Sequence, residues 1–199
     1  MNVAQGPGGS LEISLLWKIL LYTWTASEIG VVLATRTRKG GGKLLDRGSM
    51  IILWVTITLA ITAAEFLAAV VPPNIFGGGL WVRYAAAAVL AVGIAIRWTA
   101  ILLLGKAFSV NVAIHDTQSL YQGGLYRFMR HPSYTGMLII FFAIGLSERN
   151  WYSWAIVMIF PTIALLYRIH VEEVALNQAF GDAYAQYSRR TKRLIPGIY

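Results

Sequence analysis

Five apolar stretches determine what this chain can fold into, because four of them are close to the length that crosses a lipid bilayer and the fourth along the chain is somewhat shorter. They cover residues 11–34, 49–71, 80–104, 132–146 and 151–167. A bilayer span needs about 20 residues, and in lipid a backbone satisfies its own hydrogen bonds only as a helix or a closed barrel. Only 13% of the residues are charged, whereas soluble domains average about 25%. The sequence therefore predicts an all-α, polytopic integral membrane protein with about five transmembrane helices.

The positive charge is concentrated in the segments between these stretches. Thirteen of the seventeen Lys and Arg lie in the loop at 36–47, in the segment 105–131, at Arg168 and in the C-terminal tail. Because cationic loops stay on the cytosolic side of a membrane, we expect an outside N-terminus and a cytosolic C-terminus, with the segments 105–131 and 168–199, and any site that they form, at the cytosolic face. The same rule accounts for the net charge of +8, so no nucleic-acid partner is expected.

The residue types exclude several kinds of site. The chain has no cysteine, and therefore no disulfide, no thiolate metal site and no thiol nucleophile. We interpret His115 and His170 as surface residues rather than metal ligands, because the chain has no H-x-x-x-H or H-E-x-x-H spacing. The G-x-S-x-G motif of hydrolases and the G-x-G-x-x-G motif of nucleotide-binding folds are also missing from the sequence.

A polar motif, residues 123–136, stands directly before and within the fourth apolar stretch. It reads Gly-Gly-Leu-Tyr-Arg-Phe-Met-Arg-His-Pro-Ser-Tyr-Thr-Gly. A residue before proline avoids the helical region and proline is favoured at the first helical position, so His131-Pro132 predicts a sharp start of a helix. The backbone N–H groups of residues 133–135 are then expected to be unpaired. Such a helix start favours a carboxylate or a phosphate.

A second group of charges follows the fifth stretch. Arg168 and Glu172 are four residues apart and share one helix face. They can form an ion pair at the membrane surface, or each can meet a ligand of opposite charge, a carboxylate at Arg168 and an ammonium at Glu172. Glu28, Glu65 and Arg97 lie inside apolar stretches, where we expect buried pairs. A role in a pathway stays open for them, because charge inside a membrane is costly.

Motifs in the second half of the chain resemble the isoprenylcysteine carboxyl methyltransferase family, whose wider group includes membrane phospholipid N-methyltransferases. The motifs are, in order, Gly124-Leu125-Tyr126-Arg127, Arg130-His131-Pro132-Ser133-Tyr134-Thr135-Gly136, Glu172-Glu173, Phe180-Gly181 and Tyr184. The resemblance implies an integral-membrane methyltransferase that uses S-adenosyl-L-methionine without a Rossmann domain. It also implies two regions, N-terminal transmembrane helices at 1–104 and a catalytic region at 105–199.

The resemblance further implies roles for individual residues. Arg168 matches the arginine that the family assigns to substrate. The segment that wraps the cofactor corresponds to residues 118–121, where the family usually has His-x-Leu-Val. The positions implied to contact the cofactor are Gln118, Ser119, Leu120, Tyr121, Tyr126, His131, Pro132, Ser133, Tyr134 and Glu172.

The chemistry of the cofactor agrees with these positions. Glu172 can hold its ammonium group, and the helix start after His131 can hold its carboxylate. Methyl transfer is an in-line displacement that needs the acceptor and the methyl carbon close and aligned. A carboxylate acceptor is already anionic and needs no general base, and Arg168 would orient it. The lipophilic part of a small-molecule or lipidated substrate is expected to enter from the membrane lipid, between the spans.

Other functions remain open at this point. An amine or phospholipid acceptor would need a route for deprotonation, which His170 or His131 could provide, and a thiol acceptor is a further possibility. A membrane sterol reductase that uses NADPH has a similar Tyr-Arg…Arg-His-Pro-x-Tyr-x-Gly run and a C-terminal pattern like residues 193–199. It carries an Asp and a downstream Cys where this chain has Glu172-Glu173. A non-catalytic membrane protein is the third alternative.

Overall fold

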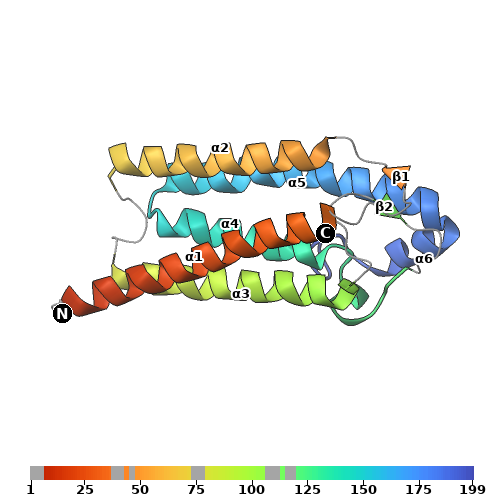
Figure 1. Ribbon diagram of the computed structural model, residues 1–199, viewed down its shortest axis with the longest axis horizontal. Helices are drawn as coiled ribbons and strands as arrows, with labels where there is room; N and C mark the ends of the chain where they lie inside the picture. Colours follow the sequence, from red (N-terminus) through yellow and green to blue (C-terminus); the bar gives the residue numbers. More distant parts are fainter. Residues whose placement is uncertain (1–6, 37–42, 45–47, 73–78, 106–112, 115–119) are drawn as a thin grey trace.

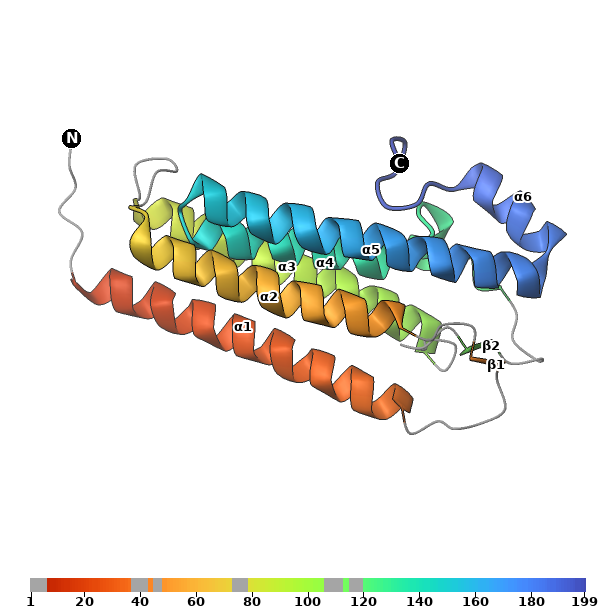
Figure 2. The ribbon, with the colours of Figure 1, turned by 90° about the horizontal axis from the view of Figure 1, so that it is seen from above.

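The computed structural model describes residues 7–36, 43–44, 48–72, 79–105, 113–114 and 120–199. Five long helices lie side by side and form an elongated bundle (Figures 1 and 2). They are α1 (Pro7–Arg36), α2 (Ser49–Val70), α3 (Leu80–Leu104), α4 (Pro132–Ser147) and α5 (Trp151–Phe180). The all-α prediction is therefore confirmed, apart from two strands of two residues each that the apolar pattern did not indicate.

Three of the described helices, α2, α3 and α5, are long and apolar enough to cross a membrane. Helix α4 is shorter, with 16 residues, and α1 carries Glu12, Lys18 and Glu28. Large apolar side chains remain exposed on the outside of the bundle, including Leu59, Phe66, Leu102 and Ile163. An apolar outer surface of this extent is typical of a membrane-embedded protein.

The helices pack through small residues at their closest approaches. At the crossing of α3 and α4, a Cβ added to Gly136 would lie 2.7 Å from the backbone nitrogen of Arg97, and one added to Gly93 would lie 3.0 Å from the carbonyl oxygen of Gly136. Helix α2 packs against α5, where the Ser153 hydroxyl donates to the carbonyl of Ala64 at 2.9 Å. Small residues let helix backbones approach closely in a membrane protein.

Helices α4 and α5 form the expected antiparallel hairpin. Asn150 begins α5 as its N-cap, and its side-chain oxygen accepts hydrogen bonds from the backbone nitrogens of Tyr152 at 2.9 Å and Ser153 at 3.3 Å. An N-cap of this kind satisfies donors that have no partner inside the helix. The turn therefore brings the part of α5 around Glu172 and Glu173 to the level at which α4 begins.

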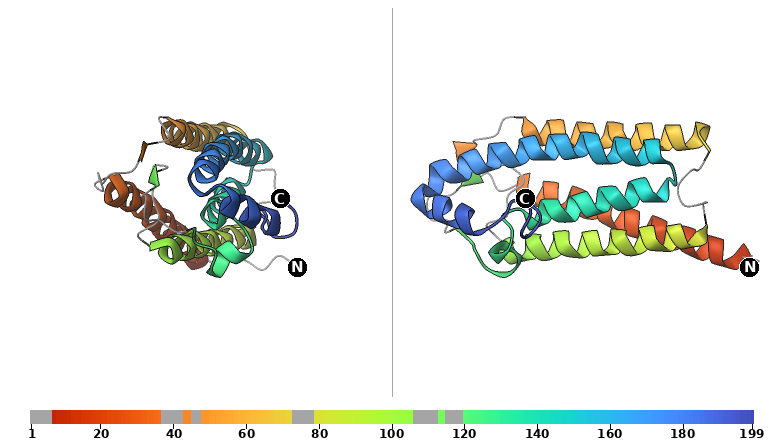
Figure 3. Two further views of the ribbon diagram at one scale, coloured as in Figure 1. Left: turned by 90° about the vertical axis from the view of Figure 1, so that its right-hand side faces the viewer. Right: turned by 180° about the vertical axis from the view of Figure 1, so that it is seen from behind.

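The polar segments meet at the other end of the bundle. They are the 3-10 helix η3 (Gly124–Arg127), helix α6 (Asp182–Arg190) and the C-terminus, together with the antiparallel strands β1 (Lys43–Leu44) and β2 (Ala113–Ile114). Figure 3 shows η3, α6 and the C-terminus around the start of α4 and the end of α5. Residues from the segments 105–131 and 168–199 thus lie together, as the charge pattern predicted.

Candidate functional site

Helix α4 begins where the sequence predicts. His131 is its N-cap, with φ −125° and ψ 57°, and Pro132 is the first helical residue. The expectation of three unpaired N–H groups is wrong, however. The backbone nitrogens of Tyr134 and Thr135 donate to the carbonyl oxygen of His131 at 3.0 and 3.1 Å. The first turn is tight enough to use these donors itself, so this helix start offers an anion fewer N–H groups than expected.

Tyr134 joins the two residues of the second predicted group. Its hydroxyl donates to Oε2 of Glu172 at 2.8 Å and accepts from Nε of Arg168 at 3.3 Å. Arg168 is 1% exposed, and its Nη1 donates to the hydroxyl of Ser49, the first residue of α2, at 2.7 Å. The side chain of Glu172 is 30% exposed. The site therefore combines a buried guanidinium with a carboxylate that remains open to a ligand.

Glu173, the neighbour of Glu172, organises the segment before α4. Its carboxylate accepts hydrogen bonds from Nε of Arg130 and Nε of Arg193, both at 2.9 Å, and lies 3.3 Å from Nε2 of His131. The backbone nitrogens of Arg130 and His131 donate to the carbonyls of Lys192 and Arg193. The C-terminal segment and Glu173 thus hold the His131 ring, which stacks on Tyr134 with ring centroids 5.6 Å apart.

An aromatic pocket lies beside Glu172. The predicted residues Leu120, Tyr121, Tyr126 and Glu172 line it, together with Tyr184 of α6. The rings of Tyr121 and Tyr126 meet edge to face at 5.7 Å. The pocket has a volume of about 90 Å³ between these residues, against at least about 300 Å³ for a typical ligand site. It can therefore hold only a part of a cofactor-sized ligand.

Two of the tyrosines around this pocket, Tyr126 and Tyr187, have raised pKa values. Burial, followed by the negative charge of Glu172, raises the pKa of Tyr126 above its ordinary value. Burial also raises the pKa of Tyr187 to about 12. The Tyr126 hydroxyl donates to the carbonyl of Ala100 at 3.3 Å, and the Tyr187 hydroxyl donates to the carbonyl of Tyr126 at 2.7 Å. These two bonds fix the pocket to α3 and α6, so the pocket has rigid walls.

Ser133 faces α3 rather than this pocket. It is 6% exposed, and its hydroxyl accepts a hydrogen bond from Nη1 of Arg97 at 2.7 Å. The Arg97 guanidinium also donates through Nε and Nη2 to the two carboxylate oxygens of Glu28. The expected buried pair within the spans therefore exists between Glu28 and Arg97, whereas Glu65 is exposed and the expectation of burial is wrong for it. This pair connects α1 and α3 with the start of α4.

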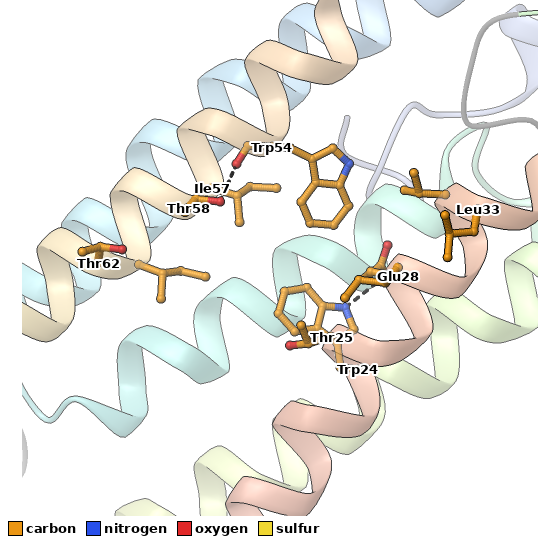
Figure 4. A pocket seen from close by; sticks show the side chains of 11 residues that line it. Trp24, Thr25, Glu28, Leu33, Trp54, Ile57, Thr58 and Thr62 are labelled. Carbon is orange, nitrogen blue, oxygen red and sulfur yellow. Dashed lines mark hydrogen bonds between the residues drawn. The ribbon is translucent and has the colours of Figure 1, made fainter. Parts of the chain in front are cut away.

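An apolar groove of about 440 Å³ lies between α1 and α2. Figure 4 shows Trp24 and Glu28 of α1 on one side of it and Trp54 and Ile57 of α2 on the other. The indole nitrogen of Trp54 is buried there and has no hydrogen-bond partner in the part of the chain that the structure describes. The groove is thus lined mainly by apolar side chains, and the indole N–H of Trp54 is available there as a hydrogen-bond donor. Glu28 lies at its border.

The structure brings most of the predicted site residues together. Tyr134, Glu172 and Arg168 are in direct contact, His131 stacks on Tyr134, and Pro132 is buried at the first position of α4. Gln118 and Ser119 lie outside the described residues. Among the described residues, no three His, Asp or Glu side chains could hold one metal ion, and His170 is exposed.

Sequence reasoning did not identify Ser49 and Glu173 as parts of the site. Ser49 lies 119 residues before Arg168, and a single serine at the start of a span carries no local signal. Glu173 could have been predicted. Two adjacent carboxylates need cations nearby, and the sequence places Arg130 directly before the fourth stretch and Arg193 in the C-terminal tail.

Comparison with known proteins agrees with the motifs. Residues 86–178 match the isoprenylcysteine carboxyl methyltransferase family. A probable protein-S-isoprenylcysteine O-methyltransferase of Oryza sativa subsp. indica is 31% identical over 122 residues, which are 59% of this chain and 63% of that protein. Protein-S-isoprenylcysteine O-methyltransferase B of Arabidopsis thaliana is 27% identical over 175 residues, which are 80% of this chain and 82% of that protein. The chain thus spans a little under two thirds of the rice relative.

The fold is also that of a solved membrane enzyme. The structure of the eukaryotic intramembrane Ras methyltransferase, isoprenylcysteine carboxyl methyltransferase, superposes with a TM-score of 0.63 at 20% sequence identity. The superposition covers 98% of this chain and 69% of that one. This superposition shows a shared fold. The resemblance to the isoprenylcysteine carboxyl methyltransferase family is confirmed by the sequence match, which extends from α3 into α5.

Proposed function

We propose that this protein is an integral-membrane methyltransferase that transfers the methyl group of S-adenosyl-L-methionine to the carboxylate of a lipophilic, isoprenylcysteine-like acceptor. The observation that carries the proposal is the contact of Arg168, Tyr134 and Glu172 beside an aromatic pocket. It provides one group for an anionic acceptor and one for a cationic donor. The rice and Arabidopsis relatives, a probable protein-S-isoprenylcysteine O-methyltransferase and protein-S-isoprenylcysteine O-methyltransferase B, support the same reaction.

The described residues are suited to hold a part of the cofactor. When bound, S-adenosyl-L-methionine supplies a methyl group on a sulfonium, next to an ammonium and a carboxylate. Glu172 is partly exposed and would hold the ammonium by a charge-assisted hydrogen bond. Leu120, Tyr121 and Tyr126 would surround part of the remaining molecule. Tyr134 would keep the Glu172 carboxylate in place through its hydroxyl.

Arg168 would orient the acceptor. Its guanidinium is held from two sides, by Tyr134 and by Ser49, which limits the positions that a bound carboxylate can take. Displacement at a methyl carbon is accelerated by such alignment, and an anionic acceptor needs no base. The apolar groove between α1 and α2 (Figure 4) supports a hydrocarbon chain as part of the acceptor.

The proposal includes a membrane topology. We propose five spans, formed by the five long helices, with the N-terminus outside and both the C-terminus and the site in the cytosol. The concentration of Lys and Arg in the loops supports this orientation. The helices within residues 1–104 would then be N-terminal transmembrane helices, and residues 105–199 would form the catalytic region.

Calorimetric titration of the detergent-purified protein with S-adenosylhomocysteine, and in parallel with NADPH, tests the proposal. We expect saturable binding of S-adenosylhomocysteine alone. Glu172→Ala should abolish this binding, whereas Glu12→Ala, the matched change at an exposed glutamate of α1, should leave it unchanged. Binding of NADPH alone would favour the sterol-reductase alternative, and binding of neither would favour a non-catalytic protein.

The acceptor is tested by turnover. With a synthetic S-farnesyl cysteine that has a free carboxylate, Arg168→Ala should lose methyl transfer and keep its affinity for S-adenosylhomocysteine. Methylation of an amine or a phospholipid headgroup in place of the carboxylate would refute the proposed acceptor. In that case His131, which lies 3.3 Å from Glu173, and the exposed His170 become the candidates for a proton acceptor.

A further inference from the structure

The ion pair of Glu28 and Arg97 is buried in the bundle, and the proposed reaction does not use it directly. The two residues are 4% and 5% exposed. Both carboxylate oxygens of Glu28 accept from the Arg97 guanidinium, and Oε1 also accepts from the indole nitrogen of Trp24 at 3.1 Å. Ionisable residues inside membrane spans are costly and mark functional sites more often than not. A buried pair is also weak support for stability, because apolar residues of similar size often stabilise a fold equally well.

The pair continues into the candidate site. Arg97 uses its remaining terminal nitrogen, Nη1, to donate to the hydroxyl of Ser133 at 2.7 Å. Ser133 is the second residue of α4 and precedes Tyr134, whose hydroxyl contacts both Glu172 and Arg168. A continuous chain of hydrogen bonds and one peptide unit therefore leads from α1 to the residues that face cofactor and acceptor.

The geometry of the bundle limits movement along this series of hydrogen bonds. The guanidinium is planar, so binding to Glu28 along one edge fixes the direction in which Nη1 points. One turn before Arg97, Gly93 brings α3 against Gly136 of α4, where an added Cβ would already lie too close to backbone atoms. The start of α4 thus has little freedom to move relative to α3 while the pair is intact.

We infer that Glu28 and Arg97 are positioning residues for the methyl-transfer site. Glu28 fixes the guanidinium of Arg97, and Arg97 fixes Ser133 and with it the ring of Tyr134 against Glu172. This inference rests on the proposed function. The inference also assigns α1 a role near the acceptor, because Glu28 of α1 borders the groove in which we place the hydrocarbon chain (Figure 4).

A double-mutant cycle tests the inference. The variants are Glu28→Gln, Ser133→Ala and the double variant, and the measured quantity is the calorimetric Kd for S-adenosylhomocysteine. Ser133→Ala leaves the ion pair intact. We expect each single change to raise Kd about tenfold and the double change to raise it no further, because residues that act through one network are not additive. Trp24→Phe, which removes only one donor to Glu28, replaces Glu28→Gln if that variant does not fold.

The matched control is Ser27→Ala, next to Glu28. The Ser27 hydroxyl accepts from the indole nitrogen of Trp98 at 3.2 Å, so it also joins α1 to α3, but through Trp98 rather than through Arg97 and Ser133. This control should keep the wild-type Kd. If the pair has only a structural role, Glu28→Gln should lower the melting temperature and leave the Kd for S-adenosylhomocysteine unchanged.

The outcomes separate the two proposals. If the wild type binds S-adenosylhomocysteine and Glu28→Gln binds it equally well, the inference is wrong and the proposed function stands. Additive effects of Glu28→Gln and Ser133→Ala would also refute the inference, because Ser133 would then contact the cofactor independently. If the wild type does not bind S-adenosylhomocysteine, the proposed function fails and the inference fails with it.

Discussion

Replacement of Gly136 by alanine is the most direct test of how α3 and α4 hold the site. The new Cβ would lie 2.7 Å from the nitrogen of Arg97, 2.8 Å from its Cβ and 2.8 Å from the carbonyl oxygen of Gly93. Two of these atoms belong to the backbone, so no side chain can turn away and the helices must separate. Overpacking of a tight contact costs about 1–3 kcal/mol, and we expect the upper end here. For a chain of this size, about 3 kcal/mol corresponds to a fall in melting temperature of about 6–12 °C.

The assay is thermal unfolding in detergent, with Gly30→Ala as the matched control. Gly30 lies inside α1, and an added Cβ there has no heavy atom within 4 Å. Alanine is favoured over glycine in a helix by about 0.5–1 kcal/mol, so the control should melt at or slightly above the wild-type temperature. Gly136→Ala should also weaken S-adenosylhomocysteine binding, since Tyr134 is two residues away. If both variants melt at or above the wild-type temperature, α3 and α4 do not approach each other as closely at Gly136 as described here.

Three further changes test other contacts. Tyr187→Phe leaves the buried carbonyl of Tyr126 without its 2.7 Å donor, which should cost about 1–3 kcal/mol of stability in thermal unfolding; an unchanged melting temperature would contradict this contact. Burial and a nearby carboxylate raise the pKa of Glu148, so its ionisation weakens the fold as pH rises through that pKa. Glu148→Gln should therefore melt above the wild type at pH 8 and equal it near pH 4, and equal melting at both would refute the shift. Ser49→Ala removes a 2.7 Å acceptor from Arg168; kcat should fall about tenfold with unchanged S-adenosylhomocysteine affinity, and an unchanged kcat would show that Arg168 needs no support.

The helices could be predicted closely because the membrane leaves few alternatives. The predicted stretches 49–71 and 80–104 correspond to α2 (Ser49–Val70) and α3 (Leu80–Leu104). In lipid an apolar run of this length has no other way to satisfy its backbone, so hydropathy alone gives the helix and nearly its ends. The pairing of β1 with β2 joins two loops far apart in sequence, and no periodicity in two residues could indicate it.

The candidate site was predictable where the signal is local. The helix start at Pro132 and the shared face of Arg168 and Glu172 depend on residues within one or two turns. The N–H groups of the first turn were predicted wrongly, because whether Tyr134 and Thr135 can reach the carbonyl of His131 depends on how tightly that turn closes. Ser49 was missed because its role exists only after α2 and α5 have packed together.

The polar residues inside the bundle explain why its helices have one register. Each of the five long helices contributes a polar side chain to one connected layer, namely Glu28 from α1, Ser49 from α2, Arg97 from α3, Ser133 and Tyr134 from α4, and Arg168 from α5. Lipid tails cannot replace any of these partners. A slide of one helix by a turn, about 5.4 Å, would therefore leave a charge or a hydroxyl unpaired. The layer that aligns the helices is also the layer that carries the candidate site, so a variant that misaligns a helix should lose ligand affinity before it loses its helices.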